Sequence, residues 1–175
     1  RRAPLVIELH TATWCTPCRP AEVELNELLN IWPSLIALHH HSSASDSLSI
    51  VASNETKNHQ GVIGYPTLVI EGRWILNGSN QSQDLFDLVA AITTEGGTRS
   101  SSQGNYSIDG WKIEDGIISV DLNVSDPTLR VDVFLVVDGV NHVPLGLLSD
   151  TVVAGQTDVD VNSTVKIPLN GSRAS

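Results

Sequence analysis

Cys15 and Cys18 are the only cysteines in the chain, and two residues separate them. A disulfide that closes so short a loop adds little stability, because the unfolded-state entropy that a crosslink removes shrinks with loop length. A structural zinc site would need two more ligands, and no second paired motif supplies them. The pair is therefore better explained by thiol–disulfide exchange than by a structural role.

The surroundings of the pair predict different roles for the two thiols. Cys15 is expected at the start of a helix, where unpaired backbone N–H groups and the helix dipole favour an anion, so it should be the attacking thiolate. Cys18 lies one turn further in, and burial should keep it protonated until it resolves a mixed disulfide. Pro17 suits the first helical turn because its missing N–H costs little there.

The elements that must position this pair alternate between strand and helix. Strands joined through helices run parallel and a closing hairpin runs antiparallel, so a mixed sheet with helices on both faces follows. Apolar periodicity, caps and turn residues predict strands at 5–9, 34–39, 65–70 and 73–76, and helices after the first cysteine, from Ser45 or Asp46 towards Lys57, and from Ser82 to Ile92.

Beyond residue 94 the pattern changes. The segment 95–104 is small and polar, as in a linker. Strands are predicted after it, at 106–113, 117–124, 129–137 and 157–167. The chain is therefore predicted to hold an α/β domain over residues 1–96, a linker over 97–104, and a small all-β, sandwich-like domain over 105–175.

A further motif, Tyr65-Pro66-Thr67, follows the first cysteine by 50 residues. Together with a C-x-x-C pair between a buried strand and a helix, it resembles the thioredoxin superfamily. The segments that narrow this resemblance are 8–15, 39–41 and 61–67 followed by Gly72. They are similar to the outer-membrane-protein-related branch of thioredoxin-like proteins, which carries a C-terminal β domain. The resemblance covers residues 3–95 and weakens thereafter.

That resemblance implies a thioredoxin-like α/β domain in which Pro66 is cis and faces the cysteines as a catalytic residue. It implies that the backbone of Tyr65 pairs with an incoming substrate chain. A trans-proline opening an edge strand is the alternative. The residues expected to bind substrate are Trp14, Thr16, Pro17, Tyr65 and Thr67.

One position departs from the family's pattern. Thioredoxins bury an acid six residues before the first cysteine, and Leu9 stands there. The adjacent Glu8 would point to the opposite face of a regular strand, so it serves only if a bulge shifts the register. Glu8 is our candidate catalytic proton acceptor, with His10 or water in its place as alternatives. A half-exposed Glu8 without a catalytic role is the other interpretation.

Three consecutive histidines, 39–41, invite a metal interpretation. In a strand His39 and His41 share a face while His40 opposes them, so a third ligand would have to come from elsewhere, such as His59. Histidines at a strand end need no ligand, however. We predict no metal and no cofactor other than the redox-active Cys15–Cys18 disulfide.

Composition narrows the partners and the compartment. The formal net charge of −10 repels nucleic-acid phosphates and anionic membranes, so we predict no nucleic-acid partner. The Asn-x-Ser/Thr acceptor pattern favours an extracytoplasmic glycoprotein, secreted, periplasmic or at the cell surface, with any membrane anchor lying outside this sequence. Shared polar turns are the alternative explanation. The seven acceptors are Asn54, Asn77, Asn80, Asn105, Asn123, Asn162 and Asn170.

The leading prediction is an extracytoplasmic thiol–disulfide oxidoreductase that exchanges disulfides with protein substrates and with an electron donor or acceptor. The dipeptide Thr16-Pro17 does not resemble the one in strongly oxidising enzymes, because it contains no histidine. This difference favours a reducing or intermediate reduction potential. The alternative is a non-catalytic, surface-exposed binding module in which the Cys15–Cys18 disulfide is structural.

Overall fold

The computed structural model describes residues 4–78, 82–94, 106–126, 128–142 and 146–169. Helices and strands of the first half follow the predicted order: β1 (Leu5–Thr11), α1 (Cys18–Ile31), β2 (Leu35–His41), α2 (Val51–His59), β3 (Thr67–Ile70), β4 (Trp74–Asn77) and α3 (Ser82–Thr94). The second half contributes β5 (Tyr106–Glu114), β6 (Ile117–Val124), β7 (Val133–Val137), β8 (Val140–His142), β9 (Gly146–Leu148), β10 (Thr151–Gln156) and β11 (Thr164–Pro168). No helix among these residues is long and apolar enough to span a membrane.

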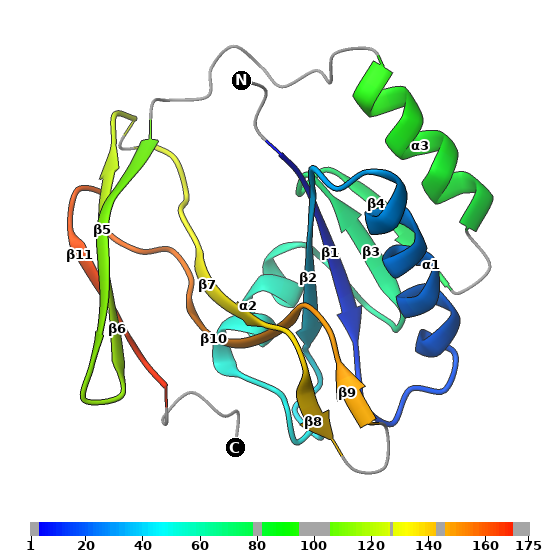
Figure 1. Ribbon diagram of the computed structural model, residues 1–175, viewed down its shortest axis with the longest axis horizontal. Coiled ribbons are helices and arrows are strands. Elements are labelled where there is room, and N and C mark those ends of the chain that lie inside the picture. Colours follow the sequence, from blue (N-terminus) through cyan, green and yellow to red (C-terminus); the bar gives the residue numbers. More distant parts are fainter. Residues whose placement is uncertain (1–3, 79–81, 95–105, 127, 143–145, 170–175) are drawn as a thin grey trace.

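A six-stranded mixed sheet in the order β4-β3-β1-β2-β10-β7 forms the centre of the molecule (Figure 1). β1 and β2 are parallel, with Leu9 opposite His39, and β3 and β4 run antiparallel to their neighbours. This sheet and its three helices are compatible with the thioredoxin-like α/β domain that was predicted.

The two faces of the sheet are covered differently. Leu9 of β1 packs against Leu25 of α1 and Leu85 of α3, all almost completely buried. The opposite face meets α2, whose Ala52 packs with Val152 of β10. Each fully buried aliphatic side chain contributes about 1.5–3 kcal/mol, so these two layers fix which residues of β1 and β2 face α1 and which face α2.

Two strands of the predicted second domain lie in the sheet of the first half. β10 runs parallel to β2, with Thr151 opposite His39, and β7 pairs antiparallel with β10. β2 is thereby an interior strand instead of an edge with unpaired backbone groups. A separate all-β domain is therefore not shown. The predicted boundary at 97–104 lies outside the described residues, so the division at that point stays a prediction.

The strands β5, β6 and β11 form a second sheet in the order β11-β6-β5. Its buried residues, including Val120 and Ile167, pack with Ala154 of β10 and with Leu135 of β7. The β7–β10 ribbon is therefore shared, with one face against α2 and the other against the three-stranded sheet. The predicted strand at 157–167 is shorter than expected, since β11 begins only at Thr164.

Candidate active site

The first cysteine lies in the tight connection between β1 and α1. The Cys15 N–H donates to the carbonyl of Ala12 at 3.0 Å, and the Cys18 N–H donates to the carbonyl of Cys15 at 3.1 Å. The helix begins at Cys18, with Pro17 in the N-cap position and no side chain capping it. Cys15 therefore lies just before the first helical turn, near the end where its anion is favoured.

The two cysteines form a disulfide, with their Cα atoms 5.4 Å apart. Cys15 is only 3% exposed and Cys18 is fully buried. Both pack in one small apolar cluster with Ala12 and the ring of Tyr65. The C-x-x-C pair is thus present in its oxidised form at the end of the central strand.

Tyr65, in the segment before β3, packs against the cluster that holds the disulfide. The peptide bond between Tyr65 and Pro66 is cis, and Pro66 is buried. The Tyr65 hydroxyl donates to the carbonyl of Ser42 at 2.7 Å and accepts from the Lys57 ammonium at 3.1 Å. Trp14, which is 55% exposed, stands edge-on to the Tyr65 ring with centroids 5.9 Å apart. The fold therefore brings the two sequence-distant motifs together.

The other residues predicted to contact substrate differ in exposure. Thr16 and Pro17, between the cysteines, are exposed. Thr67 is buried, and its hydroxyl lies 2.9 Å from both the Gly64 carbonyl and the Asn77 Oδ1. The Thr67 side chain is consequently engaged inside the protein, and Thr67 is also paired with His10 of β1 and with Asn77 of β4.

Glu8 lies on the α2 face of the sheet. No register shift interrupts the pairing of β1 with β2 or β3, so the bulge that would turn Glu8 towards α1 is absent. Its carboxylate accepts from Gln60 Nε2 at 2.6 Å and lies 3.2 Å from His40 Nε2. Burial would raise the pKa of Glu8, but the hydrogen bonds and charge of His40 and the bond from Gln60 lower it overall. The structure does not bring Glu8 to the cysteines.

His10, the other named proton acceptor, belongs to the same buried network. Its Nε2 lies 2.7 Å from Gln60 Oε1 and its Nδ1 lies 3.0 Å from Ser42 Oγ. Burial, together with the neighbouring His40, lowers the pKa of His10 to about 4. His10 is therefore neutral at pH 7 and is held by other partners than the thiols.

The histidines of β2 divide between the two faces as predicted. His39 and His41 share the α1 face with Leu9, whereas His40 lies on the α2 face beside Ser53. Over the ranges that the structure describes, no three His, Cys, Asp or Glu side chains gather as metal ligands. His59, considered as a third ligand, lies at the exposed end of α2.

Asp46 has a role that the sequence did not indicate. It was expected as a possible N-cap of the second helix, but α2 begins only at Val51. Its carboxylate accepts from the Thr13 N–H at 2.6 Å and from the Leu48 N–H at 2.9 Å, and it lies 3.0 Å from His41 Nδ1. Burial alone would raise the pKa of Asp46, but these hydrogen bonds lower it to about 2. Asp46 thereby fixes the loop that carries Trp14 and Cys15.

A second acid that the sequence analysis missed lies on α1 itself. Glu22 Oε1 accepts from the Thr11 hydroxyl at 2.9 Å, and Glu22 Oε2 accepts from Arg19 Nη1 at 2.5 Å. Burial raises the pKa of Glu22 despite these two partners. The available signal was its spacing, since a residue four positions after Cys18 shares its helix face.

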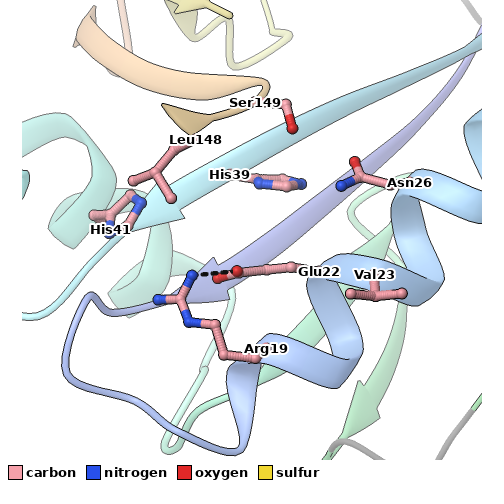
Figure 2. A pocket seen from close by; sticks show the side chains of 8 residues that line it. All are labelled: Arg19, Glu22, Val23, Asn26, His39, His41, Leu148 and Ser149. Atoms are coloured by element: carbon pink, nitrogen blue, oxygen red, sulfur yellow. Dashed lines mark hydrogen bonds and ion pairs between the residues drawn. The ribbon is translucent and has the colours of Figure 1, made fainter. Parts of the chain in front are cut away.

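Glu22 borders a polar cavity of about 170 Å³ between α1, β2 and the segment after β9 (Figure 2). His39 lines the cavity from β2, Asn26 lines it from α1, and Ser149 lines it from the C-terminal half. His39 Nε2 is buried and has no hydrogen-bond partner among the residues that the structure describes. Burial, with the nearby His41 and His40, lowers the pKa of His39 to about 4, so its ring is neutral at pH 7.

Comparison with known proteins identifies similar folds only. No family model matches the chain, and a search of curated proteins gives no match. A protein from Agrobacterium tumefaciens, whose crystal structure was a structural genomics target, is similar with a TM-score of 0.59 and 20% identity, over 97% of this chain and 80% of that one. Oxidised thioredoxin O2 from Arabidopsis thaliana matches with a TM-score of 0.40 and 18% identity, over 51% of this chain and 76% of its own. The first likeness includes the C-terminal strands and shows the fold alone.

Proposed function

We propose that this protein is a thiol–disulfide oxidoreductase acting on protein substrates outside the cytoplasm. The observation that carries the proposal is the Cys15–Cys18 disulfide at the junction of β1 and α1, in contact with the Tyr65 ring. In the reducing direction the Cys15 thiolate attacks a substrate disulfide and forms a mixed disulfide, and Cys18 then attacks Cys15, which restores the Cys15–Cys18 disulfide and releases the reduced substrate. In the oxidising direction a substrate thiolate attacks the Cys15–Cys18 disulfide, and a second substrate thiol resolves the mixed disulfide. Two electrons pass between the pair and the substrate disulfide, and a dithiol or disulfide partner resets the pair.

The surroundings of the disulfide support recognition of a polypeptide. Trp14, Thr16 and Pro17 form an exposed rim around it. Within the described residues the backbone N–H and carbonyl of Tyr65 have no hydrogen-bond partner, so both are free to pair with an extended substrate chain. Main-chain pairing of this kind accepts many sequences, which suits an enzyme acting on disulfides in different proteins.

The second candidate function is a binding module with a permanent disulfide, and the burial of Cys15 favours it. A sulfur in a residue that is 3% exposed is hard for an external thiolate to reach. In that case the thioredoxin-like sheet is a scaffold, and the acidic C-terminal strands engage the partner.

The equilibrium reduction potential of the Cys15–Cys18 pair, measured in glutathione or dithiothreitol buffers, separates the two candidates. We expect a potential between roughly −120 and −270 mV, with a Cys15 pKa below about 7.5. Cys18→Ser should in addition trap substrate proteins on Cys15, and Cys15→Ser is the matched control that should trap none. A pair that resists reduction below about −300 mV, with no trapped protein, would favour the binding module.

Extracytoplasmic location is part of the same proposal and rests on the glycosylation acceptors. Asn77, Asn123 and Asn162 are exposed, whereas the Asn54 amide donates to Ser49 and to the Ile50 carbonyl. Secretion from eukaryotic cells should therefore add glycans at the exposed sites and leave Asn54 unmodified. Mass spectrometry before and after glycosidase treatment measures this, and a mass equal to the bare chain would contradict it.

A further inference from the structure

Cys18 and Glu22 lie one turn apart on the inward face of α1. Side chains four residues apart on a helix lie on the same face, with Cβ atoms about 5–6 Å apart. Cys18 is fully buried, and the Glu22 side chain is 13% exposed. A buried thiol that must become a thiolate needs a nearby base, because burial disfavours its charged form. The inward face of α1 therefore carries a carboxylate one helical turn from that thiol.

The Glu22 carboxylate is held in place from both sides. Thr11, at the end of β1, donates to Oε1, and Arg19 donates to Oε2 and also reaches the Ala12 carbonyl at 3.5 Å. Arg19 and Thr11 thus tie Glu22 to the loop that carries Cys15. Each carboxylate oxygen keeps a second lone pair for a proton.

We propose that Glu22 is the group that takes the proton of Cys18 when Cys18 resolves a mixed disulfide, an inference that rests on the function proposed above. The Cys18 thiol gives its proton to the Glu22 carboxylate, and the resulting thiolate attacks Cys15 Sγ. The Cys15–Cys18 bond forms, the bond from Cys15 to the substrate sulfur breaks, and the substrate leaves as a thiolate. The substrate disulfide has then gained two electrons and the enzyme dithiol has lost two. In the reverse direction Glu22 protonates the departing Cys18.

Burial of Glu22 supports this assignment. It raises the pKa of the carboxyl group above its ordinary value, although the Thr11 bond and the Arg19 charge oppose the shift. A base is more effective as its pKa approaches that of the proton donor and the working pH. The other charged or titratable groups that face Glu22 are Arg19 on its own helix and, across the cavity from β2, His39 and His41.

The cavity beside Glu22 offers the proton an exit to solvent. Its volume of about 170 Å³ holds several waters. A buried nitrogen such as His39 Nε2, which has no partner within the described part of the chain, is normally satisfied by ordered water. Asn26 and Ser149 supply further hydrogen-bonding groups on the walls (Figure 2). Glu22 therefore follows the buried thiol by one helical turn and borders a cavity to which the C-terminal half contributes one wall.

The experiment is a single-turnover reaction of the reduced protein with 5,5′-dithiobis(2-nitrobenzoate), followed at 412 nm from pH 5 to 9. Attack by Cys15 releases one thionitrobenzoate, and resolution by Cys18 releases the second. In Glu22→Gln the second phase should slow by about 100-fold at pH 7, within the range usual for loss of a general base. Its rate should then rise with hydroxide, whereas the first phase should change less than about threefold.

Two further variants keep the result interpretable. Glu27→Gln alters an exposed carboxylate on the same helix and should match the wild type in both phases. Thr11→Val keeps the Glu22 carboxylate but removes one of its hydrogen bonds, so the pH midpoint of the second phase should move upward. Second phases in folded Glu22→Gln and Thr11→Val that equal the wild type at every pH would overturn the role of Glu22. A wild-type protein that releases no second thionitrobenzoate would instead overturn the proposed function.

Discussion

The imidazole rings of His10 and His40 stack beneath α2, with their centroids 5.2 Å apart and their planes 15° apart. Both histidines are fully buried, and they occupy opposite positions on the parallel strands β1 and β2. Two stacked imidazoles repel each other when both carry a proton, so this arrangement favours at least one neutral ring. The stack and the carboxylate of Glu8 form a polar cluster on the α2 face of the six-stranded sheet.

The stability of the protein should fall as the pH drops from about 6.5 to about 4. Burial lowers the pKa values of His10 and His39 to about 4 in the folded state, while the unfolded chain retains a pKa near 6.5. The unfolded state therefore binds more protons across that window, which favours unfolding. Urea unfolding at pH 7.5, 6 and 5 should show a decreasing free energy of unfolding.

Variants identify which groups cause that loss. His10→Asn should flatten the pH dependence, whereas His59→Asn, at an exposed position, should leave it unchanged. An unfolding free energy that is constant from pH 7.5 to 4.5 would show that the buried histidines do not titrate on unfolding.

Glu8→Gln should affect stability and spare the chemistry. The substitution removes the negative charge beside His40 and replaces one of the two accepting oxygens with an NH2 group, which donates. We therefore expect the free energy of unfolding to fall by about 1–3 kcal/mol. Because Glu8 lies on the α2 face, both phases of the thionitrobenzoate assay should keep their wild-type rates. A slowed second phase in this variant would restore Glu8 as the proton acceptor that the sequence suggested.

Gly155→Ala tests how tightly the C-terminal strands pack on one another. A Cβ at Gly155 would lie 2.5 Å from Cδ1 of Phe134 and 3.0 Å from the carbonyl oxygen of Val133. Relieving this overlap requires a shift of β7 or β10, at a cost of about 1–3 kcal/mol. Gly110→Ala is the control, since its Cβ would meet only the Asp121 side chain at 3.4 Å. Equal thermal midpoints for the two variants would contradict the predicted crowding.

Trp14→Ala should separate protein substrates from small ones. The indole is largely exposed and packs edge-on to Tyr65, so its removal takes apolar surface from the rim around the disulfide. We expect kcat/KM for a disulfide-bonded protein to fall about tenfold, which corresponds to about 1.4 kcal/mol of lost contact energy. Oxidation by the small 5,5′-dithiobis(2-nitrobenzoate) should be unaffected. An equal loss with both substrates would assign Trp14 to positioning the cysteines.

Local patterns were sufficient to predict the helices and strands of the first half, and also β6 in the second half. The apolar spacing at Ala21, Leu25 and Leu28 and the stop at Pro33 predicted α1, and the alternation at Val120 and Leu122 predicted β6. These signals are carried by residues close in the chain. For the same reason the sequence revealed the C-x-x-C pair, whose two members are three positions apart.

β10 shows why other features could not be predicted. Thr151–Gln156 is short and contains a glycine, and nothing in the sequence analysis marked it as a strand. Its partner on one side is β2, more than 100 residues earlier, and the His39 N–H donates to the carbonyl of Asp150 at 2.8 Å. Pairing between such distant segments is decided by burial of both, which no local window contains.

The sequence by itself determined the C-x-x-C pair, the order of elements around it and the opposed faces of the three histidines, because each follows from neighbouring residues or strand periodicity. Only the tertiary structure decided on which face of the sheet each buried acid lies. An uninterrupted register turned Glu8 towards α2, while the packing of α1 on β1 buried Glu22 beside Thr11. The tertiary structure also decided that β10 pairs with β2 and β7, because the pairing of distant segments depends on which surfaces the whole chain buries together.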